Sequence, residues 1–300
     1  MVAVGVHVSI AGSIDRAVDR AKKLGCDTFQ IFTRNPRGWR FKDLTPEQVE
    51  KFTTKIERSD IYPPVAHAPY LPNLASPKED GYSRSVDALA SEVLRCSTLH
   101  IPYLVTHLGS HLGTGTEGGV MRIISAVNTA IDAFGEARPE GGGSVMLLLE
   151  NTAGTKNSVG GRFEEIGRII DGVERDDLVG VCFDTCHAFA AGYELRTADT
   201  LDATMARFDE AIGLDRLKLV HLNDSKGGLN SRLDWHEHIG MGYIREDGFR
   251  VILHHDAIRN LPMILETPVD DRRDDVGNIR MARMLAEGAC VGDMVDKRSV

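Results

Sequence analysis

The sequence predicts an α/β protein, a single (β/α)8 (TIM) barrel with a metal site at the carboxyl ends of the strands. Eight short β-rich runs alternate with helical segments, the chain has 300 residues with 42% hydrophobic content, and acidic or histidine side chains end most runs. Strands separated by helices pair in parallel through right-handed crossovers, and eight such units favour a closed barrel. Because about 250 residues is typical of one such barrel, we expect one domain over residues 1–300.

The helical segments between the runs carry recognisable start and stop signals. Ser13 is the expected N-cap of the first helix and Gly25 its stop, because apolar side chains between them recur at helical spacing. Thr45, Pro46 and Gln48 predict a proline-initiated helix with a capping box. Strands are expected at residues 2–8, 29–33, 65–67, 103–107, 145–150, 179–184, 218–221 and 263–266.

Bulk properties exclude several classes of protein. No apolar run approaches the roughly 18 residues of a membrane span, and the start lacks a signal-peptide pattern, so a soluble, cytoplasmic protein is expected. The five cysteines suit a reducing compartment. Cys182 and Cys186 flank Asp184 and could bind metal, but their spacing favours structural thiols. A net charge of −9 argues against binding nucleic acid over the whole surface and leaves local binding open.

Acidic and histidine residues at strand ends form the main functional signal. Imidazole and carboxylate groups without thiolate suit zinc or manganese. One catalytic zinc takes three or four protein groups, so a larger set implies at least two metals and favours three. The nine candidate ligands are His67, His107, Glu150, Asp184, His187, His221, Asp234, His236 and Glu266.

Alternatives exist for each candidate taken alone. Glu150 and Glu266 close apolar runs, and a buried carboxylate needs a cation, which a neighbouring Arg or Lys could also supply. A single strand-end histidine is commonly a hydrogen-bonded structural group. Asp234 and His236 alternate across one position, so an extended segment would point both the same way. The full set on one barrel face makes the separate structural explanations improbable together.

The remaining histidines are expected to play lesser roles. His7 in the first strand is a candidate pocket group, and His111 lies in a loop from which it could touch a substrate. Surface or packing roles are expected for His100, His238, His254 and His255.

Nine motifs spread over nearly the whole chain resemble the endonuclease IV family of apurinic/apyrimidinic (AP) endonucleases. In order they are HVSIAGS, FTRNPRGW, HAPYLPNLASP, HLGSHLG, LLENTAG, FDTCHAFAAGY, HLNDSKG, RLDWHEHIGMG and LETP, beginning at residues 7, 32, 67, 107, 148, 183, 221, 232 and 265.

The resemblance implies three zinc ions per chain. His67 and His107 would hold the first, and Glu150 would bridge it to a second that also takes Asp184, His221 and Glu266; His187, Asp234 and His236 would hold the third. Glu150 and Glu266 would be the catalytic carboxylates. The implied reaction, in base excision repair, hydrolyses the phosphodiester 5′ to an abasic site and leaves a 3′-hydroxyl and a 5′-deoxyribose phosphate. Bound zinc lowers the pKa of water to about 7, which supplies a metal-bridging hydroxide as nucleophile.

The resemblance also implies contacts with double-stranded DNA around a flipped nucleotide. Arg37, Tyr70 and Leu71 match positions that push into the DNA at the lesion, where an abasic nucleotide flips out at low cost. Candidates for phosphate contacts are Arg34, Arg37, Arg40, Lys226 and Arg232, with solvation as the alternative for one or two of them. The alternative for Tyr70 and Leu71 is a packed loop. A monomer is expected by resemblance.

Three departures from the family pattern leave the candidate ligands intact. Leu108 stands where a proline is common, Thr155 and Lys156 replace Gln-Gly, and Arg245 replaces a glycine. The second change is close in sequence to Glu150 and puts the damage preference in doubt.

Two rival functions remain open from the sequence. A sugar isomerase or epimerase of the related barrels would use Glu150, Asp184, His221 and Glu266 around one divalent metal and leave five ligands idle. A protein that binds lesions without cutting would have no need for a hydrolytic cluster. Metal content separates the isomerase from the nuclease, and cleavage with and without a chelator separates the binder.

Overall fold

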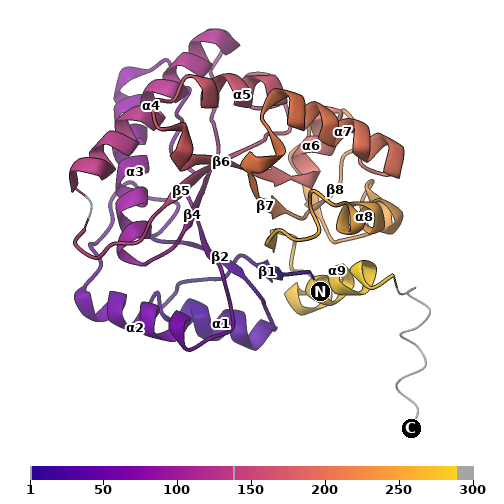
Figure 1. Ribbon diagram of the computed structural model, residues 1–300, viewed down its shortest axis with the longest axis horizontal. Helices are drawn as coiled ribbons and strands as arrows, with labels where there is room; N and C mark the ends of the chain where they lie inside the picture. Colours follow the sequence, from indigo (N-terminus) through magenta and orange to yellow (C-terminus); the bar gives the residue numbers. More distant parts are fainter. Residues whose placement is uncertain (1, 138, 289–300) are drawn as a thin grey trace.

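A computed structural model describes residues 2–137 and 139–288 and shows a ring of helices around a parallel sheet (Figure 1). The sheet has eight strands in the order β1-β10-β7-β6-β5-β4-β3-β2, and all neighbouring pairs are parallel. The two ends of this sheet also meet, because His7 and Gln30 form a bridge and the Val8 amide donates to the Gln30 carbonyl at 2.8 Å. The predicted (β/α)8 barrel is therefore confirmed.

The strands lie where the sequence predicts them. The barrel consists of β1 (Val4–Val6), β2 (Phe29–Phe32), β3 (Pro64–His67), β4 (Tyr103–Thr106), β5 (Met146–Glu150), β6 (Val179–Asp184), β7 (Leu217–His221) and β10 (Met263–Leu265). The long connection after β7 contains a small antiparallel pair, β8 (Asp224–Ser225) and β9 (His236–Glu237).

The helices cover the outside of the barrel, and α9 lies beside the N-terminal strand (Figure 1). They are α1 (Arg16–Leu24), α2 (Pro46–Glu57), α3 (Glu79–Thr98), α4 (Thr116–Ala137), α5 (Phe163–Asp171), α6 (Thr185–Ala191), α7 (Ala198–Ala211), α8 (Arg245–His254) and α9 (Asp275–Ala286), with 3-10 turns η1 (Asp176–Leu178) and η2 (Leu214–Arg216).

The predicted helix start and stop residues are confirmed, except for the N-cap of α1. Thr45 and Gln48 form the reciprocal capping box of α2, and Gly25 ends α1 in the left-handed conformation with φ 75°. The prediction that Ser13 caps α1 is wrong, because the N-cap is Asp15 and the Ser13 hydroxyl donates to the Asp15 carboxylate instead. The hydroxyl therefore fixes the turn before the helix.

Buried apolar side chains form two separate clusters, one outside the barrel and one inside it. The larger lies between the sheet and the helices, as expected when helices cover a sheet. The smaller is a layer inside the barrel, which we call the inner layer; its members are Val65, Val105, Leu148, Cys182, Leu219 and Ile264. Each strand of β3, β4, β5, β6, β7 and β10 contributes one of them.

None of the helices in the described ranges is long and apolar enough to cross a membrane.

One barrel glycine is required by the close approach of two strands. A Cβ at Gly5 would lie 1.7 Å from the carbonyl oxygen of Thr28, which belongs to the backbone and cannot move aside cheaply. We expect Gly5→Ala to lower the free energy of unfolding by about 3 kcal/mol or more, measured by urea denaturation. Gly118→Ala in α4 is the control, since a Cβ there meets no atom of residues 2–137 and 139–288 within 4 Å, and it should leave stability unchanged or raise it by about 1 kcal/mol. Equal effects of the two changes would contradict the steric explanation.

Candidate metal centre

Six of the nine candidate ligands form a second layer directly above the inner layer. Side chains two positions apart on a strand point to the same side. Each candidate follows an inner-layer residue by two positions, so all six are directed to the barrel axis at the carboxyl ends of the strands; they are His67, His107, Glu150, Asp184, His221 and Glu266. Asp184 and His221 are register partners on adjacent strands. The strand alternation thus places the ligands.

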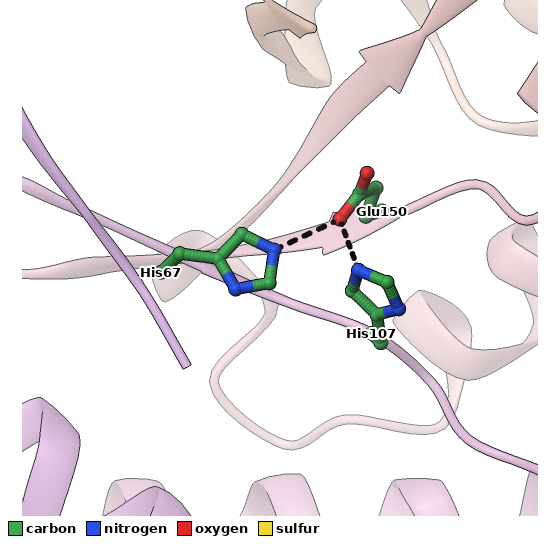
Figure 2. A group of neighbouring side chains, drawn as sticks. All are labelled: His67, His107 and Glu150. Carbon is green, nitrogen blue, oxygen red and sulfur yellow. Dashed lines mark hydrogen bonds and ion pairs between the residues drawn. The ribbon is translucent and has the colours of Figure 1, made fainter. Parts of the chain in front are cut away.

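Glu150 is the centre of this layer. One of its oxygens, Oε2, lies 3.2 Å from Nε2 of His67 and 3.1 Å from Nε2 of His107 (Figure 2). The other, Oε1, lies 3.0 Å from Nδ1 of His221 and 3.5 Å from Nδ1 of His187. The Glu150 side chain is almost fully buried, whereas His107 is half-exposed at the barrel mouth. This carboxylate therefore joins two groups of histidines.

The remaining three candidates come from outside the barrel strands. His187 lies in α6, which starts immediately after β6 with Asp184 as its N-cap. Asp234 and His236 lie in the connection after β7, and the His187 Nε2 is 2.9 Å from Asp234 Oδ1. His236 Nε2 is 3.6 Å from the same oxygen, so the alternating pair points to one place as predicted.

The nine candidates divide into three groups whose potential ligand atoms lie within 4.8 Å of one another. The groups are His67, His107 and Glu150; Glu150, Asp184, His221 and Glu266; and His187, Asp234 and His236. We call them the first, second and third groups. These three groups contain the same residues as the three ligand sets that the resemblance to the endonuclease IV family implies.

Cys186 also approaches Asp184 and His236 closely enough to be considered as a ligand. Its sulfur donates to the carbonyl of Trp235 at 3.7 Å, and burial raises the pKa of the thiol well above its usual range. Burial also raises the pKa of Cys182 to about 12. Cys26, Cys96, Cys182 and Cys186 are buried free thiols, in keeping with a structural role, while Cys290 lies outside the described residues.

Hydrogen bonds fix which nitrogen of two histidines faces the cluster. Nδ1 of His67 lies 2.7 Å from the carbonyl of Ala68, and Nδ1 of His187 lies 2.9 Å from the carbonyl of Asn151. A carbonyl accepts only, so each Nδ1 carries a proton and donates it. In the neutral ring the Nε2 lone pair then faces a carboxylate, which is unfavourable unless a cation lies between them.

His236 is oriented by a backbone carbonyl in the same way. Its Nδ1 donates to the Glu266 carbonyl at 3.1 Å. Its Nε2 is buried and has no hydrogen-bond partner among the described residues, and it lies 3.7 Å from Asp184 Oδ2 and 3.6 Å from Asp234 Oδ1. A buried unpaired nitrogen between two carboxylates is the expected geometry of a metal ligand.

Electrostatics of the cluster favour cations strongly. Burial alone would disfavour the imidazolium form of His187, but the neighbouring carboxylates, Asp184 first, raise its pKa to about 10. Burial opposes ionisation of Asp234 and Glu266 as well, yet the surrounding histidines lower each pKa to about 2. The five histidines and four carboxylates suit zinc, because imidazole and carboxylate oxygen are its usual ligands besides thiolate. The residues present therefore fit a multinuclear divalent metal centre.

Two adjoining cavities open over the cluster, with volumes of about 320 and 430 Å³. Both are lined by His67, His107, His187, Asp234 and Tyr70. Tyr70 follows β3, is 64% exposed, and its ring packs edge-on against Phe32 at 5.0 Å. Leu71 is 39% exposed beside it. The two residues thus project at the rim of the cavities rather than pack into a loop.

The basic residues proposed to contact DNA occupy different environments. Arg37, Arg40, Lys226 and Arg232 are exposed. Arg34 is buried, with its guanidinium 2.5 Å from the Glu92 carboxylate and its charge over the ring of Phe41. The expectation that Arg34 contacts phosphate is therefore wrong, because this arginine neutralises a buried glutamate. Arginine recurs at every third position in this interval, at 34, 37 and 40, so the sequence alone cannot show which of the three is buried.

Of the other histidines, His7 lies beside the cluster, with its Nδ1 3.9 Å from Glu266 Oε1. His7 lines the larger cavity, as expected of a pocket group, and its ring is 4.3 Å from that of Phe32. His111 is buried and its Nδ1 accepts from the Gly113 and Gly115 amides, so it holds its own loop rather than reaching outward.

His238 and His255 fit the packing roles expected of them. His238 is fully buried between Asp270 and Asn278, and His255 lies 3.2 Å from Asp202.

Sequence reasoning missed three polar residues that hold the candidate ligands. Asn151 and the main chain of Asp184 exchange two hydrogen bonds of 2.8 and 3.0 Å. Asn223 donates to Asp184 Oδ2 at 2.7 Å and accepts from the Glu266 amide at 2.8 Å. Gln30 is the third. Their positions in the sequence could have identified them. Each asparagine lies within two residues after a strand-end candidate, and Gln30 interrupts an apolar strand.

One departure from the family pattern has a structural consequence. Arg245 begins α8 with φ 66°, a left-handed conformation that glycine adopts without strain and arginine does not. Leu108 is buried, while Thr155 and Lys156 are exposed near the smaller cavity. These positions leave the three groups of candidate ligands intact.

Comparison with known proteins identifies the family. Residues 18–287 match the family described as xylose isomerase-like TIM barrel. A probable endonuclease 4 of Methanoculleus marisnigri is 60% identical over 286 residues, which cover 95% of this chain and 99% of the relative. The chain belongs to the endonuclease IV family.

Solved structures agree with this membership. The crystal structure of endonuclease IV from Thermus thermophilus is 38% identical, covers 95% of this chain and 99% of its own, and superposes with a TM-score of 0.82. The predictions of family and of an enzyme, a hydrolase of the endonuclease class, are therefore confirmed. A D-tagatose 3-epimerase-like protein superposes with a TM-score of 0.70 at 19% identity, which shows a shared barrel fold alone.

Proposed function

We propose that this member of the endonuclease IV family is a three-zinc AP endonuclease of base excision repair. Its substrate would be double-stranded DNA containing an abasic site. It would hydrolyse the phosphodiester 5′ to that site and leave a 3′-hydroxyl and a 5′-deoxyribose phosphate. The observation that carries the proposal is the meeting of nine imidazole and carboxylate groups at one barrel mouth, with the lone pairs of several histidines directed at carboxylates.

Each group of residues would have a distinct task. His67, His107 and Glu150 would hold one ion, and Glu150 would share a second with Asp184, His221 and Glu266. The third group would hold the last ion. When bound, the ions supply a water activated near neutral pH and stabilise negative charge on the phosphate and the departing oxygen. The carbonyls of Ala68, Asn151 and Glu266 would keep their histidine rings in the ligating tautomer.

Residues at the rim would select the substrate. Tyr70 and Leu71 are exposed above the cluster, where they would fill the stack from which an abasic nucleotide has flipped. Arg37, Lys226 and Arg232 would contact the DNA backbone, which is consistent with local binding by a protein of net charge −9. We propose that the protein acts as a monomer.

Elemental analysis together with an incision assay tests the proposal. We expect three zinc ions per chain, and 5′ incision of an abasic duplex that a strong chelator abolishes and zinc restores. About one manganese or magnesium per chain with sugar isomerisation would support the isomerase. Tight binding of the abasic duplex by zinc-loaded protein without cleavage would support the lesion binder. Sedimentation of the same sample reports the oligomeric state.

Tyr70 gives a test of the DNA contact that leaves the metals untouched. Tyr70→Ala should raise the KM for abasic duplex about 5- to 150-fold, because loss of one aromatic stacking contact costs about 1 to 3 kcal/mol, while the zinc content stays at three. Tyr62→Ala is the matched control, since Tyr62 is 65% exposed but precedes β3 at the opposite end of the barrel. An unchanged KM for Tyr70→Ala, or an equal change in both variants, would refute the assigned contact.

A further inference from the structure

A glutamine lies among the apolar side chains of the barrel interior. Gln30 in β2 is fully buried and pairs in register with Val65, a member of the inner layer. Burying a carboxamide is costly unless its hydrogen bonds are made. Its hydrogen bonds therefore indicate why a polar group occupies this position.

The carboxamide of Gln30 makes three hydrogen bonds. Oε1 accepts from Nε2 of His221 at 2.9 Å, and Nε2 donates to Oε1 of Glu266 at 2.7 Å. The second amide hydrogen is donated to Nδ1 of His7 at 3.1 Å. Turning the amide over would place its NH₂ against the His221 N–H and its oxygen against the Glu266 carboxylate, so the partners fix its orientation.

We infer that Gln30 is a positioning residue that holds His221 and Glu266, two members of the second group, with their metal-facing atoms free. Because His221 donates through Nε2, its Nδ1 lone pair is left facing Glu150 Oε1 at 3.0 Å. Because Glu266 accepts through Oε1, its Oε2 remains available 3.4 Å from the same Nδ1. This inference rests on the proposed function.

The chemistry requires an amide at this place. The site needs an acceptor for an imidazole N–H and a donor for a carboxylate within one side chain, and it needs them without added charge. His7, immediately after β1, supports the arrangement, because its Nδ1 accepts the remaining amide hydrogen and its backbone forms a bridge with Gln30. Removing a side chain that hydrogen-bonds to a metal ligand commonly lowers the metal affinity about 10- to 100-fold.

Zinc release to a chelator, titrated over a range of chelator concentrations, tests the role of Gln30. Gln30→Met keeps the size of the side chain and removes all three hydrogen bonds. We expect the apparent affinity of one zinc ion to fall about 10- to 100-fold while the other two follow the wild-type curve. The Nε2 proton resonance of His221 in the zinc-loaded protein should also shift, because its acceptor is lost. Excess zinc should restore most incision.

Thr28→Val is the matched control. Thr28 lies two positions before Gln30, is buried, and donates to the Pro63 carbonyl at 2.6 Å, so the change removes a buried hydrogen bond away from the cluster. It should lower the unfolding midpoint and leave all three zinc affinities unchanged. A Gln30→Met protein that releases zinc along the wild-type curve overturns the inference. Uniform weakening of all three sites, matched by Thr28→Val, also overturns it. A wild-type protein without bound zinc or incision refutes the proposed function instead.

Discussion

Glu150→Gln should nearly abolish incision and reduce the zinc content from three ions to about one. This carboxylate faces His67 and His107 through one oxygen and His221 through the other, so neutralising it removes a ligand from the first and second groups together. Each ion is expected to contribute several kcal/mol of transition-state stabilisation, and 1.36 kcal/mol corresponds to a tenfold change in rate. We expect kcat to fall on the order of 10⁴-fold, measured with an abasic duplex at saturating zinc.

The control for this change is a buried glutamate outside the cluster. Glu92 is fully buried and paired with Arg34, so Glu92→Gln neutralises a comparable carboxylate without touching a candidate ligand. Its stability should fall while its zinc content stays at three. If Glu150→Gln retained three zinc ions, the bridging role of Glu150 would be refuted even if incision were lost.

Asp234→Ala should release one zinc ion and leave two. Asp234 belongs to the third group alone, together with His187 and His236, and its side chain is half-exposed at the mouth. Removal of one charge-stabilising group from an active site commonly lowers kcat about 10²- to 10³-fold, and we expect an effect of that size. Zinc content by elemental analysis and single-turnover incision measure the two outcomes.

Asp271→Ala tests whether the effect is specific. Asp271 is an exposed aspartate in the connection between β10 and α9, so its removal changes the net charge equally. Zinc content and incision should match those of the wild type. Full activity of Asp234→Ala would contradict the assignment of a third ion to this group.

The barrel and the position of most candidate ligands could be predicted because strand alternation is a local property. Leu148 and Glu150 are two positions apart, as are Val65 and His67, so an apolar residue in the strand and a polar one at its end share a side. The sequence therefore predicts both the strand and which side chain at its carboxyl end points toward the barrel axis. Asp234 and His236 follow the same alternation within an irregular connection.

Features that depend on partners far apart in the chain were not predictable. Arg34 and Glu92 are 58 positions apart, and only the packing of the connection after β2 against α3 shows that this arginine is buried. Gln30 contacts Glu266 across 236 positions of sequence. The polarity of a residue is visible locally, but the identity of its hydrogen-bond partner follows from the closed barrel.

The inner layer has a consequence for access to the metal centre. Its six buried side chains form an apolar floor immediately beneath the six candidate ligands at the strand ends. Ions and water consequently reach the ligands from the mouth, past Tyr70 and the connection that carries Asp234 and His236. A duplex seated across that opening would close the compartment, so substrate and metal would share one entrance.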